Sequence, residues 1–173
     1  IIFINKNSHF LNMDETVSFL KEWFIRFLQN RDLVRRNIVS ISSKEGFDFN
    51  VNYKDKAVNF LIMPVLENSI LEKINNNENF GLIALNNFRN IKFMYANWKK
   101  FAEMRFLSLY FINPLSNTDK AWILCPYVHD NICDKGSLET GLKAMAEMVE
   151  YIDYEKIEER LKQGRQAAGP QSR

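Results

Sequence analysis

The chain has 173 residues, 46% of them apolar and 25% charged, and its 23 Lys and Arg against 21 Asp and Glu leave a formal net charge of +2. This composition excludes a disordered chain, and the length fits one domain that buries most of its apolar surface. The net charge does not by itself indicate a nucleic-acid or membrane partner, so such a partner would need a local basic patch. The 14 Phe and 3 Trp residues predict an aromatic core.

The two cysteines, Cys125 and Cys133, come without a secretory signal, which favours free thiols in a reducing compartment. We therefore expect a cytoplasmic protein. Charged or Asn residues interrupt every window long enough to span a bilayer, so no membrane partner is predicted. We expect an N-terminal extension over 1–12, a single α/β domain over 13–162, and a flexible C-terminal tail over 163–173 that is rich in Gln, Gly, Ala and Pro.

The first half of the domain begins with an amphipathic helix over 14–29, whose apolar residues recur every three or four positions. A strand over 38–42 follows, and then a strand over 47–53 in which aromatic residues and Val alternate with Asp and Asn. That alternation predicts one polar face. The segment 57–66 is apolar almost throughout, which predicts a strand at the centre of the sheet that is covered on both faces.

The second half alternates between helix and strand, which predicts parallel strands joined by crossover helices. The last predicted strand follows a loop too short for a crossover, so we expect it to pair antiparallel. The predicted elements are a helix over 69–74, a strand over 80–85, a helix over 91–103, strands over 106–112 and 121–127, a helix from Ser137 with apolar residues up to Ile152, and a helix over 153–161. The fold class is α/β: an antiparallel hairpin followed by β-α-β-α-β in one mixed sheet flanked by helices.

This order of elements over 14–112 resembles the core of the PD-(D/E)xK nuclease superfamily, the restriction-endonuclease-like fold. The segments 98–101, 110–114 and 122–129 also resemble a group of archaeal proteins that we associate with that fold and for which no activity is assigned. The resemblance implies an Asp on one strand, and an Asp or Glu and a Lys two residues apart on the next. There the carboxylates hold Mg²⁺ or Mn²⁺ and the Lys orients a water.

Asp48 stands where the first of these carboxylates would lie, but the next strand reads FLIMPVL over 60–66 and offers neither a carboxylate nor a lysine before Glu67. We therefore predict a catalytically degenerate nuclease-like domain with a binding role and no cofactor. One alternative is an active nuclease that uses Mg²⁺ or Mn²⁺ and draws its carboxylates from Glu45, Asp48 and Glu67. Another is a structural or protein-interaction module, which would act as a homo-oligomer or with a protein partner.

Residue types that bind zinc gather between the last predicted strand and the helix after it, namely Cys125, His129, Cys133 and Asp134. Their spacing lacks the usual Cys-x-x-Cys pair, so we predict no metal there. His129 with Asp130 and Asp134 could serve acid–base chemistry, but a single histidine beside carboxylates is more often structural.

Basic residues follow the first predicted helix: Arg31, Arg35 and Arg36, with Lys44 after the first strand. We predict that these four bind nucleic acid through its phosphates and without sequence preference, because no motif for reading bases accompanies them. The alternative is a solvated surface, as it is for the second basic set of Lys99, Lys100 and Arg105. The chain has no glycine-rich phosphate loop and no nucleophile elbow.

Overall fold

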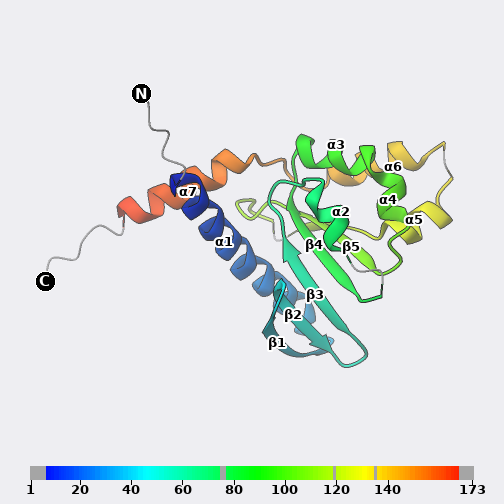
Figure 1. Ribbon diagram of the computed structural model, residues 1–173, viewed down its shortest axis with the longest axis horizontal. Coiled ribbons are helices and arrows are strands. Elements are labelled where there is room, and N and C mark those ends of the chain that lie inside the picture. The colour runs from blue at the N-terminus through cyan, green and yellow to red at the C-terminus, as the bar shows by residue number, and fades with distance from the viewer. Residues whose placement is uncertain (1–6, 75–76, 119, 135, 168–173) are drawn as a thin grey trace, which may run out of the picture.

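The computed structural model describes residues 7–74, 77–118, 120–134 and 136–167. They form an α/β domain around one six-stranded mixed sheet, in which the strands lie side by side in chain order (Figure 1). β1 and β2, β2 and β3, and β5 and β6 pair antiparallel, whereas β3, β4 and β5 are parallel. The strands are β1 (Ile38–Lys44), β2 (Phe47–Tyr53), β3 (Ala57–Ile62), β4 (Phe80–Leu85), β5 (Leu107–Ile112) and β6 (Ala121–Leu124). The predicted α/β class and the mixed pairing are confirmed.

Helices cover both faces of the sheet. The long helix α1 runs diagonally across one face with α7 beside its beginning, and the remaining helices gather on the other face (Figure 1). The helices are α1 (Asn7–Asp32), α2 (Ser69–Lys73), α3 (Phe88–Ala96), α4 (Trp98–Ala102), α5 (Pro126–Ile132), α6 (Leu138–Ala146) and α7 (Tyr154–Ala167). Within the described ranges, none of these helices is long and apolar enough to cross a membrane.

Aromatic rings form the core under α1. Phe60 of β3 is 0% exposed, and its ring stacks on Phe49 of β2 with centroids 4.8 Å apart. Phe24 of α1 and Tyr110 of β5 place their rings 5.6 Å and 5.8 Å from that of Phe60. Gly81 of β4 makes room for this cluster, because a Cβ at that position would lie 2.3 Å from the Phe60 ring. The predicted aromatic core is confirmed.

Several predicted boundaries were wrong for local reasons. The helix predicted over 91–103 is two helices, α3 and α4, divided at Asn97, whose side chain donates to the carbonyl of Phe93. The strand predicted over 57–66 ends at Ile62, two residues before Pro64. The strand predicted over 121–127 ends at Leu124, because Pro126 begins α5 and its fixed φ suits the first turn of a helix.

The helices at the two ends of the domain also have other limits than those predicted. The first helix begins at Asn7 rather than at residue 14, and α6 ends at Ala146, although Val149 and Ile152 after it are buried. The last helix continues to Ala167, so residues 163–167 of the predicted tail are helical. Residues 1–6 of the predicted extension and 168–173 of the predicted tail lie outside the described residues.

Candidate functional site

The structure does not gather the three predicted carboxylates into a metal site. Asp48 lies on β2, Glu45 lies in the exposed turn between β1 and β2, and Glu67 follows β3 at the carboxyl ends of the parallel strands. Among the described residues, no three His, Cys, Asp or Glu side chains approach closely enough to share a metal ion.

Asp48 instead bonds to the backbone of the neighbouring strand. Its Oδ2 accepts a hydrogen bond from the Ile62 N–H at 2.6 Å, and Lys21 of α1 donates to its carbonyl oxygen at 2.7 Å. Burial raises the pKa of the Asp48 carboxyl, while the Ile62 hydrogen bond and the charges of Lys21 and Lys73 act in the opposite direction. This carboxylate links the ends of two strands.

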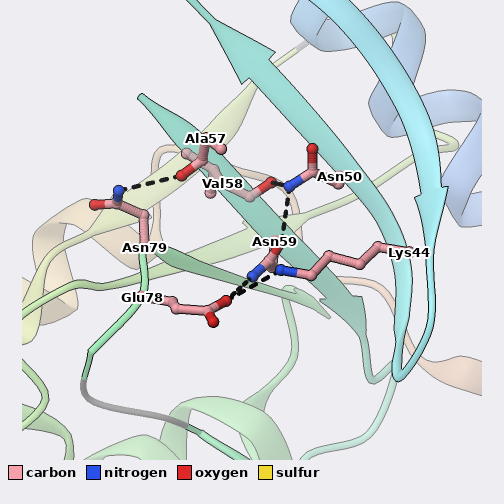
Figure 2. Close-up of polar contacts among 7 residues, drawn as sticks. All are labelled: Lys44, Asn50, Ala57, Val58, Asn59, Glu78 and Asn79. Carbon is pink, nitrogen blue, oxygen red and sulfur yellow. Dashed lines mark hydrogen bonds and ion pairs between the residues drawn. The ribbon is translucent and has the colours of Figure 1, made fainter. Parts of the chain in front are cut away.

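A chain of polar side chains runs across the sheet on the face opposite α1, as Figure 2 shows. Asn50 of β2 donates to Asn59 Oδ1 at 2.7 Å and to the Val58 carbonyl at 3.2 Å. Asn59 donates to Glu78, and the same carboxylate oxygen accepts from Lys44 Nζ at 3.1 Å. Lys44 is therefore already paired with an acid.

The predicted zinc candidates lie around a helix and make other contacts. Cys125 precedes α5 and Cys133 follows it, and both thiols are free. The Nδ1 atom of His129, inside α5, is 2.8 Å from the Cys125 carbonyl oxygen. Asp134 accepts from the Gly136 N–H at 3.1 Å, and Asp130 accepts from Trp98 Nε1 at 2.7 Å. The segment we predicted as strand and loop over 125–132 is thus mostly helix, and His129, Asp130 and Asp134 have structural partners.

Two of the predicted phosphate-binding residues do lie together. Arg31 and Arg35 line a hollow of about 470 Å³ at the amino ends of β3, β4 and β5, and Lys56 from the turn before β3 joins them. The Arg31 guanidinium lies over the Phe27 ring, 5.4 Å from its centroid. Arg36 is exposed but does not line the hollow. The sequence pattern missed Lys56, because it is far from the arginines along the chain, in the turn between β2 and β3.

The chain turns after α1 through backbone contacts of Asp32 and Arg36. Arg36 adopts a left-handed conformation, with φ of 50°, and its N–H donates to the Asp32 carbonyl at 2.7 Å. The Asp32 carboxylate then accepts from the N–H groups of Asn37 and Ile38 at 2.9 and 2.8 Å. Asp32 lines the same hollow, but its oxygens hold these two backbone amides.

Two phenols complete the hollow. Tyr53 and Tyr110 both line it, and burial is the main cause that raises the pKa of each hydroxyl. Both remain neutral at physiological pH. The other acid in the lining is Asp55, which is exposed beside Lys56 in the turn between β2 and β3. The hollow therefore combines three cationic side chains, two carboxylates and neutral hydroxyl groups.

A second hollow, of about 420 Å³, adjoins the first. Lys44, Asn59 and Glu78 line it, and it shares Asn79 and Phe106 with the first hollow. Asn79 is held by a hydrogen bond of 3.1 Å to the Ala57 carbonyl (Figure 2). We call the two adjoining hollows the amino-end groove.

A separate hollow of about 530 Å³ lies at the carboxyl ends of β3 and β4, the usual place for ligands in open α/β sheets. Its charged residues are Glu67, Asp153 and Glu155 with Arg89. The excess of carboxylates makes it a poor place for a phosphate, in contrast to the amino-end groove.

Comparison of the chain with protein-family models, with curated proteins and with solved structures gave no match.

Proposed function

We propose that this chain is a catalytically degenerate nuclease-like domain that binds nucleic acid through phosphates at the amino-end groove. The order of α1, the antiparallel strands β1 to β3, and the parallel strand β4 after α2 is the order that the nuclease resemblance implies. Topology alone does not define an activity, so the functional part of the proposal rests on the site.

One observation carries the binding role: Arg31, Arg35 and Lys56 line a single hollow although they come from two separate parts of the chain. Guanidinium and ammonium groups that converge on an open hollow are suited to phosphate oxygens. Sequence-independent binding is expected, because these contacts address the backbone and not the base edges.

The Asp48 region supports binding rather than cleavage. Asp48 is held by the Ile62 amide, and on the adjacent strand β3 the polar residue is Asn59, which is engaged with Asn50 and Glu78. An amide supplies no negative charge for a divalent cation, so this arrangement lacks the paired carboxylates that the nuclease reaction needs.

Titrations of a fluorescent oligonucleotide at several salt concentrations test the binding role. We expect measurable affinity at low salt, and a loss of about tenfold or more when Arg31 and Arg35 are both replaced by Ala. The slope of log K against log salt should become shallower by about 1 to 2, since each lost phosphate contact contributes about 0.7 to 0.9. Arg89→Ala, in the carboxyl-end hollow, is the matched control and should bind like wild type. No affinity at low salt, or equal loss in the control, would overturn the proposal.

Incubation of the protein with DNA or RNA and Mg²⁺ or Mn²⁺ tests separately whether the domain lacks nuclease activity. We expect no cleavage by the wild-type chain. Metal-dependent cleavage that disappears in Asp48→Ala would show that the domain is an active nuclease.

A further inference from the structure

We infer that the amino-end groove takes single-stranded rather than duplex nucleic acid, with one base stacked on Phe106. This inference rests on the proposed function and concerns the same groove. The basic residues alone can bind the phosphates of either form. The inference adds a surface that distinguishes an unpaired strand from a duplex.

Phe106 is the exposed aromatic residue at the junction of the two hollows. The residue is 46% exposed, and it lines both hollows. It lies in the turn directly before β5, where its carbonyl accepts a hydrogen bond of 3.0 Å from the Phe80 N–H at the start of β4. An aromatic ring that is anchored through its backbone and open to solvent is a suitable stacking platform for a base.

The charges on either side of Phe106 differ. On one side the hollow contains the cations Arg31, Arg35 and Lys56 with the carboxylates Asp32 and Asp55, so the cations are in excess. On the other side, Lys44 is neutralised by Glu78, and Glu78 is in turn held by Asn59 (Figure 2). Phosphates are therefore expected on the arginine side of the ring. An adjacent base can then lie over Phe106 without bringing its phosphate to the Glu78 carboxylate.

The size of the arginine hollow agrees with this arrangement. Its volume of about 470 Å³ is within the usual range of about 300–1,000 Å³ for small-molecule sites, so it can hold a unit of the size of a nucleotide. In a duplex the faces of the bases are stacked on their neighbours, and a base must be extruded at a cost before it can reach a protein ring. A single strand offers its base faces without that cost.

Anisotropy titrations with three probes test the inference. The probes are an oligo(dT) strand, the matching dT·dA duplex and an abasic strand of equal length, each also measured with inorganic phosphate as competitor. For the wild-type chain we expect about tenfold or tighter binding of oligo(dT) than of the duplex or the abasic strand. Phe106→Ala should weaken oligo(dT) binding about 10-fold and leave the abasic strand unchanged, and Phe106→Trp should retain binding of oligo(dT).

Phe88→Ala is the matched control, since Phe88 is also an exposed aromatic residue but lies outside the groove, stacked on Tyr151. Far-ultraviolet circular dichroism of each variant shows that a loss of binding is not a loss of fold. Equal affinity for oligo(dT) and duplex, or oligo(dT) binding unchanged by Phe106→Ala, would overturn this inference and leave the proposed function standing. Absence of binding to every probe would overturn both.

Discussion

Two adjacent residues of β3, Asn59 and Phe60, point to opposite faces of the sheet. One lies in a chain of hydrogen-bonded polar side chains, and the other lies in a cluster of aromatic rings. Phe60 is surrounded by the rings of Phe24, Phe49 and Tyr110 under α1. Asn59 is only 4% exposed, yet it bonds to Asn50 and Glu78 in a polar chain that ends at the amino-end groove. The ring cluster gains its stability from burial, whereas the polar chain retains buried amides only because each has a hydrogen-bond partner.

The comparison teaches how two regions beside one strand are held by different forces, although the face that carries the polar chain also packs an apolar core under α2 to α6. Burial in the ring cluster is non-directional, so many apolar residues of similar volume could maintain it. The polar chain is directional: its hydrogen bonds place the Glu78 carboxylate and the Lys44 ammonium at fixed positions in the groove wall. Substitutions in the two regions should therefore have different consequences for stability.

The largest expected effect comes from Phe60→Ala, which removes the ring at the centre of the α1 face. We expect the free energy of unfolding to fall by about 3–5 kcal/mol, because a completely buried ring is replaced by a cavity. Urea denaturation followed by circular dichroism measures this change. Val34→Ala is the control, since Val34 is 93% exposed and its truncation should cost less than about 0.5 kcal/mol. A similar loss in both variants would show that the effect does not come from the buried ring.

A smaller effect is expected from Asn59→Leu on the opposite face. The change removes a partner of Asn50 and of Glu78, and it should lower the free energy of unfolding by about 1–3 kcal/mol. Adding Asn50→Leu should restore part of that loss, because an apolar pair leaves no unsatisfied amide between the strands. A double-mutant cycle measures the coupling. If the losses of unfolding free energy in the two single variants simply add in the double variant, Asn50 and Asn59 do not act as a connected pair.

The smallest effect is expected from Asp48→Asn, and it appears in how the free energy of unfolding depends on pH. The folded-state pKa of Asp48 is raised above its ordinary value of 3.8, so its ionised form is disfavoured by folding. The cost is present above the folded-state pKa and disappears as the pH falls below the unfolded-state pKa. Asp48→Asn keeps an acceptor for the Ile62 amide and removes the charge, so it should be slightly more stable than wild type at pH 7 and equal to it near pH 3. Denaturant titrations at both pH values measure the difference, and a less stable variant at pH 7 would contradict it.

The sequence predicted most of the sheet because its patterns are local. The apolar run of β3 reflects its burial, and the element order predicted the parallel pairing of β3, β4 and β5. The alternation of aromatic and polar residues marks β2 as a strand, but Asn50 of its polar set is buried with Phe49 and Val51. The break at Asn97 could not be predicted in this way. It depends on a single side chain that competes for a backbone carbonyl, which leaves the apolar periodicity intact.

The groove was predicted only in part. Arg31 and Arg35 are four residues apart across the end of α1, so their proximity follows from sequence, whereas Lys56 and Phe106 reach the same place only through the pairing of distant strands. Lys44 was predicted to act with the arginines, but its ammonium lies over Phe47 and pairs with Glu78 in the adjoining hollow. Sequence proximity to the arginines did not indicate on which side of the sheet it would lie.

Because the order of the strands in the sheet is the order of the strands in the chain, the topology also bears on how the domain assembles. Each strand pairs with the strands immediately before and after it, so no strand has to insert between two that are already joined. Contacts between neighbouring segments close short loops, which favours rapid folding and growth of the sheet from the amino terminus during synthesis. Contacts between the two ends of the chain differ, and among them α7 packs beside α1, where Arg165 bonds to Glu15 across 150 residues. That long-range closure is the step we expect to come last.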